Sequence, residues 1–258
     1  MIMRRVSAGL RRQDWMAIGI ELLIVVVGVF AGTWVANWNE ARVERENTIR
    51  LLDQFKSEIR YQVAQYEFLR TYMATTGNYA KVALAGWERR PQVSDNEFVI
   101  SAYQASQVAG AAINTQNWAS IFGSTQVQNI RDPVLRGRLI RLLSLDSSVI
   151  DYHQVQSDYR QHVRQVIPDD VQSAIRERCG DRFKADGSSA PFLPPTCDLV
   201  LPASRARATA AALRAHPSLV NDLNWHRSLV ATMLDQYRNY ATNLNALGKA
   251  IDESRQRR

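Results

Sequence analysis

The hydrophobic residues of this chain fall into one continuous apolar run followed by amphipathic stretches. The run covers residues 15–36, and Glu21 is the only charged residue in it. As a helix rising about 1.5 Å per residue, the run would span roughly 33 Å, close to the hydrocarbon thickness of about 30 Å in a bilayer. Trp15 lies at one end and Trp34 and Trp38 lie at the other, where indole rings favour the interface. The run therefore predicts a transmembrane helix.

The residues after this run predict one long helix over 40–88, continuous with the membrane segment. Its hydrophobic positions recur at alternating steps of three and four, with one polar interruption, which is the spacing of a seam that packs on another helix. Pro91 favours an end to the helix, because a residue before proline avoids the helical conformation. The seam consists of Leu52, Phe55, Ile59, Gln62, Tyr66, Leu69 and Met73.

Two more helices are predicted in the middle of the chain. The second helix covers residues 96–122 and ends at Gly123. The third begins with Asp132 as its N-cap and Pro133 at its first position, where a missing amide donor costs nothing. Hydrophobic positions continue in this third helix as far as Val163.

The rest of the chain contains one irregular stretch and two helices. Proline, glycine and serine are concentrated in residues 178–203, and a short helix from Ser204 stops before Pro217. The final helix has the most regular pattern, with hydrophobic positions alternately four and three apart. Those positions are Leu219, Leu223, His226, Val230, Met233, Tyr237, Tyr240, Leu244, Leu247 and Ile251.

These patterns predict an all-α fold, in which an N-terminal transmembrane helix is followed by an antiparallel helical bundle with one irregular loop. Four long amphipathic helices with short connections pack in this way. The expected parts are a cytoplasmic basic segment at 1–14, a single transmembrane helix at 15–38 and a helical periplasmic domain at 39–258. Only 12 glycines and 8 prolines leave little material for the tight turns of an all-β fold.

Composition and charge indicate a foldable chain with a mixed surface. Hydrophobic residues make up 46%, charged residues make up 22%, and the net charge is +7. Residues 1–38 contribute +2, so the remaining 28 basic and 23 acidic residues contribute +5. No basic cluster is interleaved with aromatic residues, and we therefore expect no nucleic-acid partner.

The orientation of the membrane helix is predicted from its flanks. Four basic residues precede the helix and four follow it within about twenty residues, so their number alone does not decide. The preceding arginines lie closer to the bilayer and long domains translocate largely regardless of charge, which favours a cytoplasmic N-terminus in a bacterial inner membrane. The alternative is a cleaved signal peptide, because Val29, Phe30 and Ala31 loosely fit a cleavage site.

The two cysteines bracket the irregular stretch. A disulfide between Cys179 and Cys197 would stabilise the folded chain by roughly 3 kcal/mol, because it restricts the loop in the unfolded state. Such a bond requires an oxidising compartment, which favours an external domain. The alternative is a pair of half-buried thiols in a cytosolic domain. The spacing is not that of a Cys-x-x-Cys redox pair.

Candidate chemistry is sparse. The histidines at positions 153, 162, 216 and 226 do not pair at helical spacing with one another or with an acidic face, so we expect no metal site. His226 lies within the final hydrophobic seam, which favours a hydrogen-bonded core histidine over a ligand. The sequence has no phosphate-binding loop, dinucleotide turn or nucleophile elbow. We expect no catalytic residue, no cofactor and no enzyme activity.

One face of the membrane helix carries a distinctive set of residues. At about 100° per residue, Gly28 and Gly32 lie about 20° to either side of Glu21 around the helix axis. Asn39 lies at the same angle as Glu21. Glycines four apart let helix backbones approach closely in lipid, and an intramembrane carboxyl group is a candidate functional residue. We therefore expect a membrane-helix interface at these four residues. The alternative is that Glu21 extends to water and the glycines are incidental.

The stretch from Ile18 to Arg42 resembles the opening of a family of uncharacterised bacterial membrane-anchored proteins. The resemblance rests on an apolar helix with an early Glu21, a mid-helix Gly28 and the Asn-Trp-Asn-Glu exit at residues 37–40. It covers roughly the first 60 residues and extends more weakly into residues 118–143. The family has no assigned activity, so the resemblance implies the architecture and not a function.

The expected function is that of a membrane-anchored, non-enzymatic accessory or scaffolding protein acting through helix–helix contacts. Its expected partners are the lipid bilayer and a membrane protein, or further copies of the chain, bound through the transmembrane helix. The alternative is a helical ligand-sensing ectodomain. The 14 residues before the membrane helix are too few for an output domain, so such a sensor would signal through a partner protein.

Overall fold

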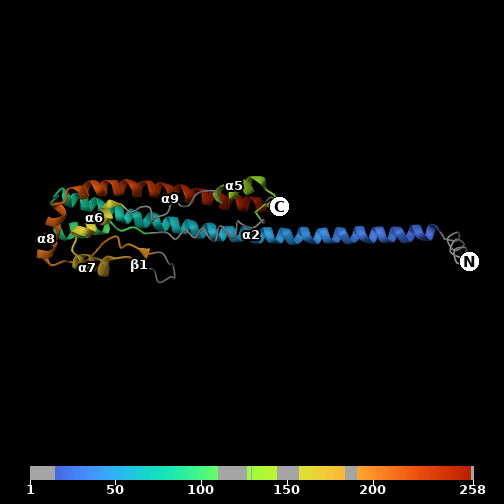
Figure 1. Cartoon of the computed structure of the whole chain (residues 1–258), viewed down its shortest axis with the longest axis horizontal. Helices are drawn as coiled ribbons and strands as arrows, with labels where there is room; N and C mark the ends of the chain where they lie inside the picture. The colour runs from blue at the N-terminus through green and yellow to red at the C-terminus, as the bar shows by residue number, and fades with distance from the viewer. Residues whose placement is uncertain (1–14, 110–126, 129, 144–156, 184–190, 257–258) are drawn as a thin grey trace, which may run out of the picture. The chain divides into compact units, whose positions relative to one another are not determined.

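The computed structural model describes residues 15–109, 127–128, 130–143, 157–183 and 191–256 (Figure 1). Within these residues the chain forms seven α-helices and one antiparallel pair of two-residue strands, β1 (Arg182–Phe183) and β2 (Pro191–Phe192). The predicted all-α fold is confirmed. The expected basic segment at 1–14 lies outside the described residues.

The chain divides into two compact units, Met1–Asp53 and Gln54–Arg258. The first described element, α2 (Trp15–Trp87), is a single helix of 73 residues, so the predicted continuity of the apolar run with the following helix is confirmed. An apolar stretch of α2 has a mean hydropathy of 2.1 and none of it is buried, which makes this helix long and apolar enough to cross a membrane.

The end of α2 is set by its backbone. Arg90 N donates to Ala85 O at 3.0 Å and Arg89 N donates to Gly86 O at 3.2 Å, which closes the last turn. Arg89 takes the left-handed conformation with φ of 55° that this type of helix end requires. The helix therefore stops just before Pro91, as the sequence predicts.

Within the second unit, α2 packs antiparallel against α9 (Ser218–Gln256), which runs alongside it in Figure 1. Lys56 Nζ lies 2.5 Å from Asp252 Oδ1, whereas Tyr66, ten residues further along α2, stacks on Tyr237 with ring centroids 5.6 Å apart. The contacting residues of α9 occur earlier in the sequence as those of α2 occur later. The two helices are therefore antiparallel, as predicted.

Both predicted seams are buried. Leu52, Phe55, Ile59, Gln62, Tyr66, Leu69 and Met73 are all buried. Of the ten predicted positions in α9, nine are buried and Tyr240 is half-buried. The α9 seam therefore closes within a single chain.

Shorter helices complete the second unit, and α3 (Asp95–Gln104) and α8 (Ala203–Arg214) pack on each other. Gly86 lies directly under the ring of Phe98, where an added Cβ would be 2.2 Å from Phe98 Cδ2, so only glycine fits there. Arg214 lies over the Phe98 ring and its Nη1 donates to Asp95 Oδ1 at 2.8 Å. These contacts join the end of α2, the start of α3 and the end of α8.

The predicted second helix is too long. The helix α3 ends at Gln104 rather than at residue 122, and the described residues 105–109 are not helical. The reason lies in α6 (Asp158–Val166), because Arg160 Nη1 donates to Ser106 O at 2.6 Å and so satisfies a carbonyl beyond the helix end.

The predicted third helix is two helices in the structure. The first is α5 (Pro133–Leu143), and its predicted N-cap is confirmed, since Asp132 Oδ1 accepts from the amides of Val134 and Leu135 at 2.9 and 3.1 Å. Immediately before α6, Ser157 is extended, with φ −88° and ψ 143°. A continuous helix to residue 163 is therefore wrong.

The expectation of four long helices is also wrong, because among the described elements only α2 and α9 exceed 12 residues. The irregular stretch begins at the end of α7 (Asp169–Cys179), as predicted. It contains the short strand pair before α8 begins at Ala203.

Candidate functional site

The predicted face of the membrane helix, formed by Glu21, Gly28, Gly32 and Asn39 and called the Glu21 face below, is uncovered. All four residues are exposed. A Cβ added to Gly28 or Gly32 would meet no atom within 4 Å.

The polar residues of the apolar helix differ in how they are satisfied. Thr33 Oγ1 donates to the carbonyl oxygens of Val29 and Phe30, both at 3.0 Å, so its hydroxyl is satisfied inside its own helix. Asn39 Oδ1 accepts a long bond of 3.4 Å from Arg42 Nη2. Among the described residues, Glu21 has neither a hydrogen-bond nor an ion-pair partner. Its carboxyl group is therefore not satisfied within its own helix, unlike the hydroxyl of Thr33.

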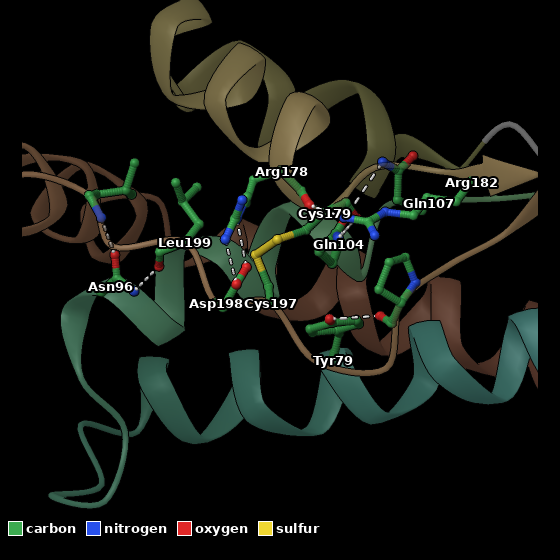
Figure 2. The surroundings of a disulfide bond; sticks show 12 residues. Tyr79, Asn96, Gln104, Gln107, Arg178, Cys179, Arg182, Cys197, Asp198 and Leu199 are labelled. Atoms are coloured by element: carbon green, nitrogen blue, oxygen red, sulfur yellow. Dashed lines mark hydrogen bonds and ion pairs between the residues drawn. A yellow bond between two sulfur atoms is a disulfide. The ribbon is translucent and has the colours of Figure 1, made fainter.

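A second candidate site is the loop that follows α7. The structure joins Cys179, at the end of α7, to Cys197, with their Cα atoms 5.5 Å apart, so it brings together the two cysteines that the sequence pairs. Gln104 Nε2 donates to Cys179 O at 2.6 Å from the end of α3. The disulfide thus ties the loop to α7, and the Gln104 hydrogen bond ties the end of α7 to α3 (Figure 2).

Non-covalent bonds hold the same loop at three further points, all visible in Figure 2. Arg178 forms a two-pronged ion pair with Asp198 at 2.8 and 2.6 Å, and its guanidinium lowers the pKa of that carboxyl. Asn96 clamps the backbone, since its Nδ2 donates to Leu199 O at 2.9 Å and its Oδ1 accepts from Leu201 N at 2.8 Å. Tyr79 OH donates to Pro194 O at 2.9 Å.

A cavity of about 360 Å³ opens between this loop, α2 and α3. Its lining includes Asn78 and Tyr79 from α2, Asn96 and Ser101 from α3, and Cys197 from the loop. Amide and hydroxyl groups beside an aromatic ring suit a small polar ligand. Sequence reasoning did not identify Asn78, Asn96 or Ser101, because the helices and the loop that meet here are distant in the sequence.

His226 is a core residue, as its place in the seam predicts. Its Nδ1 lies 2.7 Å from Ser157 Oγ and its ring lies 5.8 Å from that of Tyr159. Burial, together with the positive charge of Arg160, lowers the pKa of the imidazole to about 4. The histidine is therefore neutral near pH 7 and shares a hydrogen bond with the serine.

Two of the other three histidines lie in the described part of the chain, and both are exposed. His162 Nδ1 lies 2.8 Å from Asp222 Oδ2 on the surface, and His216 is exposed at the end of α8. Among the described residues, no three metal-ligating side chains gather. His153 lies outside the described residues.

Comparisons with protein-family models, with curated proteins and with solved structures found no match to this chain. The resemblance of the first 60 residues to uncharacterised membrane-anchored proteins therefore stays a prediction.

Proposed function

We propose that this chain is a membrane-anchored, non-enzymatic accessory or scaffolding protein that acts through helix–helix contacts. The N-terminal part of α2 spans a bacterial inner membrane once, and the helical domain lies in the periplasm. The Glu21 face binds a helix of another protein molecule within the bilayer.

The observation that carries this proposal is the uncovered Glu21 face. A carboxyl group about 9 Å inside the Trp15 interface is costly in lipid unless a donor or acceptor meets it. Two glycines on the same side allow a second helix to come close enough to supply one. The four residues of this face are exposed, and in this proposal the second helix comes from another molecule.

The periplasmic placement is supported by the disulfide. Cys179 and Cys197 lie in bonding geometry in a loop that several helices hold in place, and such bonds persist in oxidising compartments. The continuity of α2 supports the role of a scaffold, since the helix that carries the Glu21 face also supplies the buried seam of the domain.

Purification of the full-length chain in mild detergent tests this function. We expect the chain to retain a stoichiometric partner, either another membrane protein or a differently tagged copy of itself. Gly32→Leu should reduce this retention, whereas the matched Val27→Leu, about 120° away from Glu21 on the helix, should preserve it. Recovery of a monomer without a partner, or equal retention by both variants, would contradict the proposal.

The cavity beside the disulfide favours a second candidate, a ligand-sensing ectodomain that signals through a partner protein. Its volume of about 360 Å³ falls in the range of small-molecule sites. Mass spectrometry of small molecules released from the purified chain tests this candidate. A compound released by the wild type but not by Thr196→Trp, which fills the cavity from the exposed loop, would support it; no such compound would argue against it.

A further inference from the structure

We propose that the helix bound at the Glu21 face belongs to a second copy of this chain, so that two copies form a parallel pair in the membrane. This inference rests on the proposed function, because it names the partner of the same face. Two observations favour a second copy over a different protein, and a third separates the two kinds of partner by experiment.

The first observation is the chemistry of the two polar groups on the face. A carboxyl group taken into hydrocarbon without a cation keeps its proton, because transfer of a carboxylate costs far more. A carboxyl group that keeps its proton carries both a donor and an acceptor, as does the amide of Asn39. In a pair with twofold symmetry each residue lies opposite its own copy, so each group can satisfy its counterpart. The face is therefore self-complementary at both of its polar positions.

The second observation is the position of the glycines between these polar groups. Gly28 and Gly32 lie within about 20° of the line from Glu21 to Asn39. Neither glycine has a neighbouring atom within 4 Å of an added Cβ, so two backbones can approach there. Copies of one chain enter a membrane in the same orientation, and the pair is therefore parallel with Glu21 at the same depth in both helices.

The third observation is that the charges of the helix exclude an ionic contact between copies. Residues 15–36 contain no lysine, arginine or histidine, so a second copy cannot offer a cation to Glu21 within the bilayer. A different partner with a basic residue at that depth would bind the ionised carboxylate. The Glu21→Gln variant distinguishes these two kinds of partner. Glutamine keeps a donor and an acceptor for a second copy but cannot form an ion pair with a basic residue.

The α9 seam does not offer a second open face. Nine of the ten seam positions of α9 are buried within a single chain, so its hydrophobic surface is already covered.

Resonance energy transfer between donor-labelled and acceptor-labelled full-length chains in lipid vesicles tests the inference. We expect transfer that falls on dilution with lipid, as for a reversible pair. Glu21→Leu and Gly32→Leu should each weaken the association by about three- to thirty-fold, the range of single polar and packing contacts between membrane helices. Glu21→Gln and Val27→Leu should retain it, and the far-ultraviolet circular dichroism of all four variants should match that of the wild type.

The outcomes separate this inference from the proposed function. Absence of transfer for the wild type, or its loss in Glu21→Gln, would overturn the self-pairing inference. If a different protein is nevertheless retained in mild detergent through Gly32, the proposed function stands and only the identity of the partner is wrong. If neither a second copy nor another protein is retained, both are wrong.

Discussion

His226 Nδ1 and Ser157 Oγ lie 2.7 Å apart, although 69 positions separate the two residues in the sequence. This bond links α9 to the residue that precedes α6, and both side chains are buried. Protonation of the imidazole would place a positive charge in this buried site, near the guanidinium of Arg160.

Stability should therefore depend on pH through His226. Its pKa is lowered from 6.5 to about 4 in the folded chain, so the unfolded chain binds more protons between these values. The stabilisation is complete above about pH 6.5 and is lost as the pH falls towards 4, by roughly 3 kcal/mol. Chemical denaturation at several pH values measures this loss. His226→Gln should be less stable at pH 7, and its free energy of unfolding should change less between pH 6.5 and 4. The exposed His216→Gln should follow the wild type. If His226→Gln instead loses as much stability as the wild type over this range, the pH dependence does not come from His226.

The disulfide should stabilise the second unit. Cys179 and Cys197 are 18 positions apart, and closing a loop of that size contributes about 3 kcal/mol. We expect the Cys179→Ser, Cys197→Ser double variant to melt at a lower temperature and the wild type to lose the same amount on reduction. Mass mapping of non-reduced peptides should show the two cysteines linked. Recovery of both as freely alkylated thiols, from protein prepared without reductant, would disprove the bond.

The α9 seam should not tolerate charge. Val230 is 6% exposed and Leu244 is 3% exposed, so Val230→Asp or Leu244→Asp buries an unpaired carboxylate and should cost several kcal/mol, on the order of 3 to 5. The matched controls Ala231→Asp and Ala246→Asp are exposed on the same helix and should change the melting temperature little. Equal melting of seam and control variants would show that the seam is not a core.

The proposed periplasmic domain has its own test. Alkaline phosphatase folds to an active enzyme only where its disulfides form, so a fusion after Arg258 should be active in cells. The same fusion to a chain that lacks residues 15–38 should be inactive, because it is not exported. An inactive phosphatase together with a fluorescent cytoplasmic reporter at the same position would place the domain on the other side.

The sequence predicts those parts of the fold that depend on local periodicity. The seams of α2 and α9 are visible because Leu52 to Met73 and Leu219 to Ile251 repeat at helical steps, and burial follows from that repetition. The N-cap at Asp132 is predictable for the same reason, since capping is a contact between near neighbours. Tyr240 continues the pattern but is only half-buried, because its ring lies at the side of the seam against Tyr66.

Features that depend on distant contacts are not predictable in this way. The helix α3 is shorter than its pattern because Arg160, 54 positions away, satisfies the carbonyl of Ser106. The cavity requires Asn96 to hold a loop more than 100 positions later in the chain, and a single asparagine carries no sign of this in the sequence. The Glu21 face is an intermediate case, because its residues follow from helical spacing while its proposed occupant is another molecule.

Photo-cross-linking from successive positions of residues 20–36 in native membranes tests most directly whether the membrane helix binds another helix through the Glu21 face. A helix that uses the Glu21 face should give cross-links that recur every three to four residues, with maxima at Val25, Gly28 and Gly32 and minima at Leu23 and Phe30. Uniform yields along the scan, or maxima at Leu23 and Phe30, would contradict the account.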